Sequence, residues 1–542
     1  MRNGTTASHD SALDGRRLIL ASNREPFKVV NGRNGKDRKY EPSVGGLATA
    51  LNPVLSHCEG LWISWNPVPA AANGHATVKE MRGDDVPFPL VQIGLQKDEI
   101  KGYYNGFCNR ALWPLCHGNL RYVTPRLDYW HRFRDVNYRF ADTIASHAAP
   151  GDVVWIHDYH LMLVPAALRR QLGPGQPMGY FHHVPFPNAR ILSAFPWHRR
   201  LLVGMLGADS VAFHTPEYAT NFIECCRELL NCEADANDGV IQYRDHRTVV
   251  GVRPIGLDVD QFEAFARDAS VQWQAEEIRK KTAGSRLVLS VDRIDYTKGL
   301  LERVDAIRTF FARLPQARGV VTFMQIAVPS RLGVSEYREY RDKLEAAVKS
   351  LNKEFGRDNW QPMIYRTDSL DQRALAAHYL AADVVLVTPA KDGMNLIASE
   401  YCASRIDGDG AVVLSYQAGA STYLGEFVVN VNANRKDSIV NGIVQALTLS
   451  PAERAYRMTR LRSLVRKNTT RVWLGHCLRD IVRPGKAGSA ASPGHAAGAR
   501  RANGNGAEAA KTSRPTATGS GRQQKSRRDN QHSTHHAIEP AP

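Results

Sequence analysis

The sequence has no long uninterrupted apolar run. No stretch approaches the roughly 18 uncharged apolar residues that a membrane-spanning helix needs. Residues 1–15 are polar and lack the apolar centre of a secretory signal peptide. These absences argue against a membrane span and an export signal, so we expect a cytoplasmic location with no membrane partner.

Cysteine is sparse and irregularly spaced. Eight cysteines occur among 542 residues, and no Cys-x-x-Cys pair is present. Structural zinc sites and disulfide frameworks need more regular spacing in a chain of this kind. We therefore expect reduced, mostly buried thiols and no metal site.

The net charge of +16 is unevenly spread. Residues 483–542 hold ten Lys and Arg against three acids, which accounts for +7 of that charge. Gly, Ala, Ser, Pro and Asn dominate the segment, so it cannot bury enough apolar surface to offset the entropy of ordering. We expect a disordered basic tail that is solvated, with a weak polyanion or membrane-surface contact as the alternative. We do not expect a nucleic-acid partner.

Short apolar runs alternate with amphipathic stretches of helical length between residues 16 and 482. The runs predict strands at 17–22, 61–65, 153–157, 178–182, 210–214, 248–254, 287–291, 320–326, 363–365, 384–388, 412–415 and 427–431. Apolar spacing of three and four predicts helices, of which 300–314 and 336–355 are the clearest. Alternating strands and helices indicate parallel sheets with both faces covered.

The strands fall into two series, which predict an α/β chain with two doubly wound, Rossmann-like domains facing across a cleft. We place a disordered N-terminus at 1–15, the first domain at 16–255 and the second at 256–482. Ligands of open parallel sheets bind beyond the carboxyl ends of the strands. Chemistry should therefore be sought in the residues that follow each strand.

The stretch "DGMNLIASE", residues 392–400, follows one predicted strand and opens a helix. Asp392 and Glu400 are either favourable charges near a helix start or parts of a site. In "SVDRIDYTKGL", Arg293 and Lys298 follow another strand and suit a pyrophosphate, although surface cations would look the same. No carboxylate cluster for a divalent cation stands out.

Two further strand ends carry polar residues, Asp158 in "WIHDYH" and His183 in "FHHVPFP". Because structural histidines are common, only their joint occurrence favours a shared site. Gly45 and Gly46 precede a helical pattern and suit an anion, although a plain turn is the simpler interpretation.

Aromatic residues with polar handles suit a sugar pocket but also a core. Trp65 ends a predicted strand, and Tyr104 and Trp113 lie in "GYYNGFCNRALWP", which we expect to be loop-rich. Arg24 in "SNREP" and Arg331 in "QIAVPSR" lie at the mouths of other strands and are available for anions.

Nine motifs together carry a resemblance over residues 16–482. In order they are "SNR", "GGLATAL", "YYNGFCNRALWP", "WIHDYHLMLVP", "FHHVPFP", "DRIDYTKGL", "IAVPSR", "DGMNLIASEY" and "VLSYQAGA". The chain resembles the trehalose-6-phosphate synthases, the retaining GT-B glycosyltransferases of family 20. The resemblance implies a last helix, around 452–481, that crosses back to the first domain.

The resemblance also implies the roles of residues. His183, Arg293, Lys298 and Asp392 would be catalytic. The UDP-glucose donor would bind at Gly45, Gly46, His183, Arg293, Lys298, Asp392, Gly393, Met394, Asn395, Leu396, Ile397 and Glu400. The glucose 6-phosphate acceptor would bind at Arg24, Trp65, Tyr104, Trp113, Asp158 and Arg331, with Arg24 and Arg331 holding the phosphate.

The implied reaction transfers glucose to glucose 6-phosphate and gives α,α-trehalose 6-phosphate and UDP. It implies no metal and no cofactor, a role such as osmoprotection, and a homo-oligomer. No Asp-x-Asp-x-Thr run follows residue 400, so we expect a separate trehalose-phosphate phosphatase. No motif supplies an obvious nucleophilic carboxylate, which implies a same-face displacement.

Three points stay open in the sequence. "NREPF" also resembles glucosylglycerol-phosphate synthases, whose smaller acceptor would make Trp113 and Arg331 dispensable. A non-catalytic sugar-phosphate sensor is a second alternative, although Arg293, Lys298, His183 and Asp392 are all present. The charged insert between Arg24 and Gly45 suggests a mobile loop or lid and leaves UDP, ADP and GDP open as the nucleotide.

Overall fold

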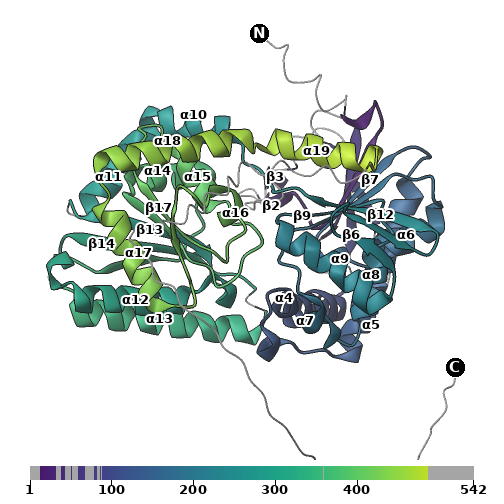
Figure 1. Ribbon diagram of the computed structural model, residues 1–542, viewed down its shortest axis with the longest axis horizontal. Coiled ribbons are helices and arrows are strands. Elements are labelled where there is room, and N and C mark those ends of the chain that lie inside the picture. The colour runs from purple at the N-terminus through teal and green to yellow at the C-terminus, as the bar shows by residue number, and fades with distance from the viewer. Residues whose placement is uncertain are drawn as a thin grey trace, which may run out of the picture. The chain divides into compact units, whose positions relative to one another are not determined.

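The computed structural model describes residues 12–31, 38–42, 51, 59–66, 78–81, 86, 88–282, 284–331, 333–357 and 359–485. Two large sheets flanked by helices and one small two-stranded sheet make up this part of the chain (Figure 1). The fold is of the mixed α/β class with two largely parallel sheets, as the alternating pattern predicts.

The first large sheet has ten strands. They are β1 (Leu18–Arg24), β4 (Gly60–Asn66), β5 (Val78–Met81), β6 (Leu90–Gly94), β7 (Val153–His157), β8 (Met178–His182), β9 (Ser210–Phe213), β10 (Glu233–Asp235), β11 (Val240–Tyr243) and β12 (His246–Val252). Their order is β10-β11-β12-β9-β8-β7-β1-β4-β6-β5. The run from β12 to β6 is parallel, and antiparallel strands lie only at the two edges of this sheet.

Both faces of this sheet are buried, which explains why its central strands are continuous apolar runs. Ile19 and Ala21 of β1 belong to one core cluster, while Leu18 and Leu20 belong to another. The covering helices of this half are α3 (Lys97–Glu99), η1 (Ile100–Leu112), α4 (Trp113–Cys116), η2 (Leu120–Tyr122), α5 (Leu127–His147), η3 (Tyr159–Leu161), α6 (Val164–Leu172), α7 (Ala189–Ser193), α8 (His198–Met205) and α9 (Pro216–Leu230).

The second large sheet has six strands, all parallel. They are β13 (Arg286–Arg293), β14 (Val321–Val328), β15 (Met363–Arg366), β16 (Val384–Val387), β17 (Ala411–Ser415) and β18 (Val429–Val431), in the order β15-β14-β13-β16-β17-β18. The same alternation recurs, since Val288 and Leu289 enter different core clusters. The helices of this half are α10 (Val259–Arg267), α11 (Ala269–Lys281), η4 (Tyr296–Lys298), α12 (Leu300–Arg313), η5 (Pro315–Ala317), α13 (Ser335–Phe355), α14 (Gln372–Ala381), α15 (Ile397–Ser404), α16 (Ser421–Leu424), α17 (Lys436–Thr448), α18 (Pro451–Lys467) and α19 (Thr470–Val482).

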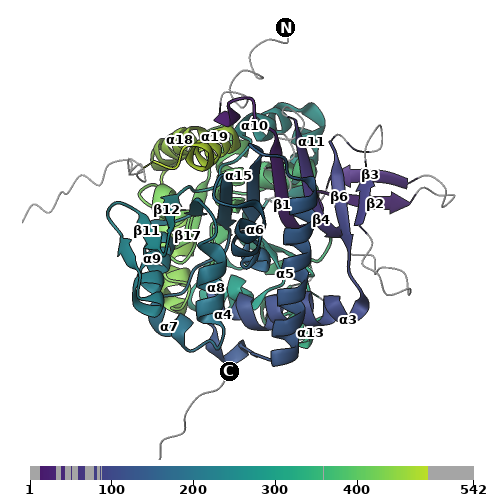
Figure 2. The same cartoon turned by 90° about the vertical axis from the view of Figure 1, so that its right-hand side faces the viewer.

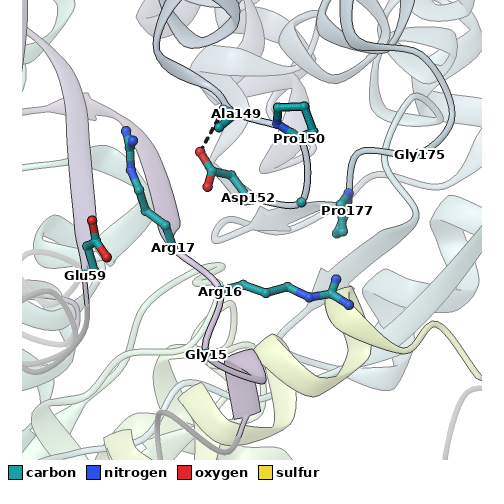
Figure 3. Close-up of a pocket in the computed structure, with 10 residues that line it drawn as sticks. Gly15, Arg16, Arg17, Glu59, Ala149, Pro150, Asp152, Gly175 and Pro177 are labelled. Atoms are coloured by element: carbon teal, nitrogen blue, oxygen red, sulfur yellow. Dashed lines mark hydrogen bonds between the residues drawn. The ribbon is translucent and has the colours of Figure 1, made fainter.

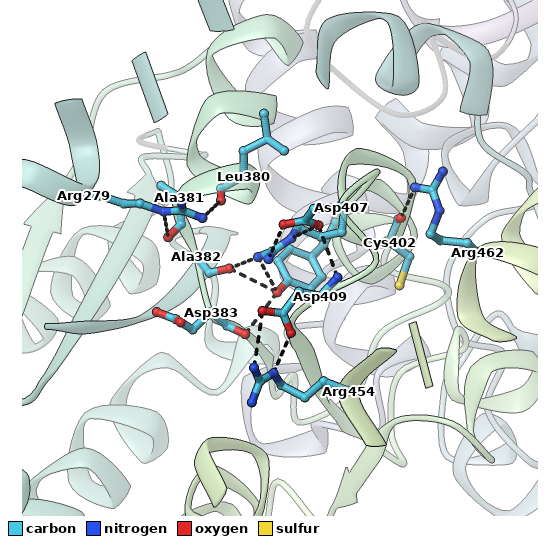
Figure 4. A network of polar contacts seen from close by, with 12 residues as sticks. Arg279, Leu380, Ala381, Ala382, Asp383, Cys402, Asp407, Asp409, Arg454 and Arg462 are labelled. Atoms are coloured by element: carbon cyan, nitrogen blue, oxygen red, sulfur yellow. Dashed lines mark hydrogen bonds and ion pairs between the residues drawn. The ribbon is translucent and has the colours of Figure 1, made fainter. Parts of the chain in front are cut away.

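A polar network fixes the strand and helix that flank residues 388–396 (Figure 4). Arg405, almost fully buried after α15, donates to the carbonyl of Ala382 just before β16 and pairs with Asp407 at 2.8 Å. The hydroxyl of Tyr401 reaches the carbonyls of Ala382 and Asp383 at 3.2 Å each. The end of α15 is thereby tied to the start of β16.

The last helical stretch is two helices rather than one. α18 ends at Lys467, and the side chain of Thr469 caps α19 by accepting from the backbone N–H of Val472 at 3.3 Å. The aromatic ring of Trp473 in α19 lies 5.4 Å from that of Trp155 in β7, whereas α18 packs on the second half through residues such as Met458. The interruption falls where the chain passes from one half to the other.

The segment expected to be loop-rich, around Tyr104 and Trp113, is helical instead. Its glycines serve close packing rather than turns. A Cβ on Gly102 would lie 2.7 Å from Cγ of Arg132, and one on Gly106 would lie 2.7 Å from the ring of Tyr129, both on α5. The prediction was wrong because glycine at a helix–helix contact has the same signature as glycine in a loop.

The insert between Arg24 and Gly45 contains two strands among its described residues. β2 (Phe27–Asn31) and β3 (Arg38–Pro42) pair antiparallel as the separate small sheet, seen at the side of the view in Figure 2. Over its described residues the insert is therefore a β-hairpin, and a role as a mobile lid stays a prediction from the sequence.

Seven cysteines are described, all as free thiols, and six of them are buried. Burial raises the pKa of thiols such as Cys402, to about 12, so these groups are unreactive near neutral pH. Within the described ranges, no helix is both long and apolar enough to cross a membrane.

Candidate active site

The polar residues singled out in the sequence follow the carboxyl ends of parallel strands. Arg24 ends β1, and Asp158 and His183 directly follow β7 and β8. In the second sheet, Arg293 ends β13 and Asp392 lies in the turn after β16. Ligands of open parallel sheets bind at this edge, so these turns form the candidate site.

The carboxylate of Asp392 is held by two donors. Lys298 Nζ forms an ion pair with its Oδ2, and Asn395 Nδ2 donates to the same oxygen at 3.0 Å. Burial by itself would raise the pKa of Asp392, but the Lys298 ammonium and these hydrogen bonds outweigh burial and lower it. Asp392 is therefore an ionised acceptor, suited to the hydroxyl groups of a ligand.

Close backbone contacts shape the turn that carries Asp392. A Cβ on Gly393 would lie 2.3 Å from the carbonyl oxygen of His183, so only glycine lets the two loops meet. Asn395 adopts φ +69°, a left-handed conformation that asparagine tolerates, and its Oδ1 accepts from the N–H of Ile397 at 3.2 Å. The backbone thus enters α15 through a fixed turn.

The other residues between Asp392 and Glu400 differ in how deeply they are buried. Met394 is buried, and Leu396 and Ile397 are partly buried. Glu400, in the first turn of α15, accepts a hydrogen bond from the hydroxyl of Tyr379 at 2.7 Å. Burial raises the pKa of Glu400, and that hydrogen bond opposes the rise only partly.

The guanidinium of Arg331 lies over the ring of Trp113. Its guanidinium carbon is 3.9 Å from the Trp113 ring centroid, and its Nη1 donates to Asp295 Oδ2 at 2.5 Å. Arg331 Nε is buried without a partner among the described residues, and the residue has φ +49°. Arg293, exposed, lies 5.9 Å from the same ring. Two cations of the second half therefore converge on one aromatic residue of the first.

Arg24 is held by Tyr104. Its Nη2 donates to the Tyr104 hydroxyl at 2.7 Å, and the ring centroids of Tyr104 and Trp65 are 5.7 Å apart. Asn23 accepts from Trp65 Nε1 at 2.9 Å and from the hydroxyl of Tyr103 at 2.6 Å. These contacts form an aromatic wall with a cation at its rim, an arrangement suited to an anionic sugar.

Asp158 has an unusual backbone and an unusual acidity. Its φ is +75°, and its Oδ1 accepts from the N–H of His183 at 3.2 Å. Burial raises the pKa of Asp158 to about 6, while backbone hydrogen bonds and the charges of Arg331 and Arg293 oppose the rise. Strained backbone and perturbed acidity are both frequent at functional sites.

The two halves also meet just outside this cluster. Tyr218, near the start of α9, donates from its hydroxyl to the carbonyl of Asp392 at 3.2 Å. Arg110 of η1 pairs with Glu336 of α13 at 3.1 Å. A hollow of about 170 Å³ lies behind Asp392, lined by residues that include Tyr218, Lys391 and Tyr416.

A larger hollow, of about 630 Å³, lies elsewhere (Figure 3). Arg16, Arg17, Asp152 and Pro177 line it, and these residues precede strands β1, β7 and β8. It therefore opens at the amino ends of the strands, where ligands of parallel sheets do not normally bind. We assign the site to the carboxyl ends, where the cations and aromatics converge.

Gly45 and Gly46 lie outside the described residues, so the structure gives them no place. Among the residues that it does describe, no group of three or more His, Cys, Asp and Glu is arranged to hold a metal ion.

A family model described as Glycosyltransferase family 20 matches residues 16–483. The chain belongs to glycosyltransferase family 20. Its fold is accordingly the GT-B fold of that family, with two Rossmann-like halves. A family 20 relative, the trehalose-6-phosphate synthase of Mycolicibacterium gilvum, is 37% identical over 84% of this chain and 92% of its own length.

A second relative is the bifunctional trehalose-6-phosphate synthase/phosphatase of Thermoproteus tenax, 38% identical over 86% of this chain. This chain spans 62% of that protein's length, and 63% of the synthase A of Dictyostelium discoideum. Solved family structures are also similar. The E. coli trehalose-6-phosphate structure bound with UDP-2-fluoro glucose has a TM-score of 0.78 and 29% identity, covering 86% of this chain and 99% of its own.

The α,α-trehalose-phosphate synthase (UDP-forming) of Burkholderia xenovorans, in complex with glucose-6-phosphate, gives the same TM-score of 0.78 and 29% identity. That match covers 86% of this chain and all of the Burkholderia chain. Both solved structures thus match the full two-sheet architecture.

Sequence reasoning missed several residues that shape this family 20 site. They are Asn23, His157, Tyr218, Asp295 and Arg303, which contact the predicted residues rather than projecting from the motifs as obvious ligands. A signal existed for three of them, since Asn23, His157 and Asp295 lie inside quoted motifs. Nothing in the sequence indicates the others.

Proposed function

We propose that the chain is a retaining glycosyltransferase that moves glucose from UDP-glucose to glucose 6-phosphate, with α,α-trehalose 6-phosphate and UDP as products. The observation that carries the proposal is the convergence of Arg293 and Arg331 on Trp113, beside the Asp392–Lys298 pair. Cations from two strand ends suit a diphosphate and a phosphate that must lie close together. Relatives named for this activity add support.

In this proposal Asp392 accepts hydrogen bonds from the donor glucose and Glu400 from the ribose. Arg293 and Lys298 stabilise the leaving diphosphate, and the backbone from Gly393 to Ile397 faces it. Arg24 and Arg331 hold the acceptor phosphate, with Trp65, Tyr104, Trp113 and Asp158 around the acceptor sugar.

A covalent route would need a free carboxylate behind the anomeric carbon. Asp392 is engaged by Lys298, which favours a same-face displacement governed by positioning and charge.

The proposal extends to the metal requirement of the reaction and to the use of its product. The cations Arg293 and Lys298 take the part that a metal has in other phosphate chemistry, so we propose that turnover needs neither a metal nor a cofactor. A separate phosphatase would dephosphorylate the product, in a pathway that serves osmoprotection. A cytoplasmic location, a homo-oligomeric state, the domain limits at 255 and 482 and the basic tail stay predictions from the sequence.

The direct test is incubation of the enzyme with UDP-glucose and glucose 6-phosphate. We expect UDP and a non-reducing disaccharide phosphate, without added metal and in the presence of a chelator. Parallel reactions with ADP- and GDP-glucose establish the nucleotide. Absence of the disaccharide phosphate with every donor would refute the proposal.

A glucosylglycerol-phosphate synthase is the second candidate, and glycerol 3-phosphate is its diagnostic acceptor. The stacking of Arg331 on Trp113 beside an aromatic wall favours an acceptor with a sugar ring. We therefore expect glucose 6-phosphate to be the better acceptor. A non-catalytic sensor would bind sugar phosphate but form no product.

A further inference from the structure

A second histidine, His157, is hydrogen-bonded to His183. His157 ends β7 and is fully buried, and its Nδ1 lies 2.9 Å from Nε2 of His183. The two rings are nearly parallel, at 22°, with centroids 5.2 Å apart. The rings of Trp155 and Phe181 pack on His157 at 4.4 and 6.3 Å. The pair thus bridges the carboxyl ends of two neighbouring parallel strands.

One proton is shared in this contact. Burial lowers the pKa of His157 to about 3, and burial together with the neighbouring histidines lowers that of His183 well below its usual value, so both rings are neutral near pH 7. A neutral imidazole carries one N–H and one acceptor nitrogen. Either His157 donates from Nδ1 to His183, or His183 donates from Nε2 to His157.

The other ring nitrogen of His157, Nε2, distinguishes the two arrangements. Its Nε2 is buried and has no partner among the described residues. If His183 were the donor, His157 would carry its own proton on that Nε2, which leaves a buried N–H without an acceptor. Buried N–H groups of that kind are rare and costly. If His157 is the donor, only an unused lone pair is buried.

We propose that His157 is a positioning residue that holds His183 in its Nδ1–H tautomer, so that His183 presents a hydrogen-bond donor to the glucose of the nucleotide sugar. This inference rests on the proposed function, in which His183 contacts that sugar. His183 is partly exposed, and its Nδ1 is not among the enclosed atoms that lack a partner. Its main chain is fixed by Asp158 and lies against Gly393.

The remaining neighbours of His183 leave this assignment in place. His214 lies 5.3 Å away between ring centroids, and its Nδ1 accepts from the backbone N–H of Ile255 at 3.3 Å. Trp473 meets His183 through a ring contact at 6.3 Å. Neither contact supplies a proton donor to Nε2 of His183, so that position belongs to His157.

The tautomer can be observed directly. The whole chain is labelled with ¹⁵N-histidine, and two-bond ¹H–¹⁵N correlations are assigned to His183 by comparison with His183→Asn. We expect a protonated Nδ1 and an unprotonated Nε2 on His183. A protonated Nε2 in the wild-type protein overturns the proposal. This NMR measurement requires no catalytic activity, so its outcome is independent of the test of the proposed function.

Kinetics with matched variants supply the second test. Asparagine keeps an N–H near the position of imidazole Nδ1, whereas leucine keeps only the bulk and glutamine moves the amide further out. We expect His157→Leu and His157→Gln to lower kcat/KM for UDP-glucose about ten-fold, the worth of one hydrogen bond to a buried group. His157→Asn should stay within about three-fold of wild type, and the KM for glucose 6-phosphate should not change.

His182→Leu is the control, because His182 is also a buried imidazole whose Nε2 has no partner among the described residues, but its Nδ1 contacts the hydroxyl of Tyr180 rather than His183. It should leave the kcat/KM for UDP-glucose unchanged. Full activity in His157→Gln, or equal losses in His157→Asn and His157→Gln, overturns the proposal even if His157→Leu fails to fold. If the wild-type protein transfers no glucose, the proposed function is wrong. The NMR measurement then still shows whether His157 holds His183 in the Nδ1–H tautomer.

Discussion

At the scale of single residues, the site is a set of charges whose partners are already in place. Lys298 is engaged with Asp392, and Arg331 is engaged with Asp295. Arg293 differs, because its side chain is exposed and forms no hydrogen bond or ion pair with other described residues. Arg293 is therefore the cation with the most freedom to bind an arriving anion.

Arg293→Ala and Lys298→Ala should each lower kcat by about 10²-fold or more, with a smaller rise in the KM for glucose 6-phosphate. The reason is that charge on the leaving diphosphate develops in the transition state, where a neighbouring cation stabilises it most. Steady-state kinetics with both substrates varied measures the effect.

Lys436→Ala is the control for this pair, since Lys436 forms an exposed ion pair with Asp305. The kcat and KM of Lys436→Ala should equal those of the wild-type enzyme. Unchanged turnover in either Arg293→Ala or Lys298→Ala would contradict the role assigned to that residue.

Asp158 should make the protein less stable as the pH rises. Its pKa is about 6 in the folded chain against 3.8 ordinarily, so between these values the folded state keeps a proton that the unfolded state releases. The free energy of unfolding should therefore fall by on the order of 3 kcal/mol from about pH 4 to about pH 6 through this group alone.

Urea denaturation of wild type and Asp158→Asn across this pH range isolates the effect, because all other carboxyl groups are common to both proteins. The difference in stability between the two should grow in favour of the variant as the pH rises. A constant difference would show that the acidity of Asp158 is ordinary.

At the scale of elements, one buried arginine organises the strand ends of the second half. Arg303, in α12, has no solvent exposure. It donates to Asp292 Oδ2 at 2.6 Å, to Gln325 Oε1 at 2.7 Å and to Thr388 Oγ1 at 2.9 Å. The ends of β13 and β16, and the middle of β14, are thereby tied to one helix. Its place in the sequence, inside an amphipathic helix, gives no sign of this.

Arg303→Met should destabilise the protein by about 3–5 kcal/mol, because it leaves the Asp292 carboxylate buried without its partner. The double variant Arg303→Met/Asp292→Leu should recover much of that loss, since an apolar pair needs no compensating charge. Urea denaturation at neutral pH checks both. A single variant as stable as wild type would contradict this account.

Much of the element order was predictable. All twelve predicted strands occur, most within two residues of the expected ends, because buried parallel strands are continuous apolar runs between turns. Six strands, β2, β3, β5, β6, β10 and β11, were not predicted. β10 and β11 are short strands at one sheet edge, and β2, β3 and β5 carry charged residues. β6 is an uncharged, buried run that the apolar pattern alone could have revealed. Helix η1 was missed because its glycines reflect contact with α5, which is visible only in three dimensions.

At the scale of the whole molecule, the site depends on contacts between the two halves. Arg110 donates to Glu336 from Nε at 3.2 Å and from Nη2 at 3.1 Å, and also to Ser335 at 2.8 Å. The rings of Tyr122 and Tyr296 lie 4.6 Å apart nearby. The ring of Tyr296 lies 5.5 Å from that of Tyr337, whose hydroxyl accepts from Arg331 at 3.2 Å. The junction between the halves is thereby connected to Arg331.

Reversing one charge should loosen this junction. Arg110→Glu and Glu336→Arg should each lower kcat/KM for glucose 6-phosphate several-fold, with little effect on unfolding, because a partly exposed ion pair contributes only about 0.2–1 kcal/mol. The double reversal should restore most of the activity. Steady-state kinetics of the wild type and the three variants forms a double-mutant cycle. If the double variant loses as much kcat/KM as the two single variants combined, the Arg110–Glu336 pair does not support the site.

The fold class, the succession of strands along the chain and the motif residues at the strand ends could all be predicted from the sequence alone. Those features follow from local apolar patterns and from chemistry carried by single short stretches. The three-dimensional contacts were needed to show which residues hold the site in shape, such as His157 behind His183 and Asp295 behind Arg331. The reason is physical: burial, tautomer and pKa are set by neighbours distant along the chain, and no local pattern encodes those neighbours.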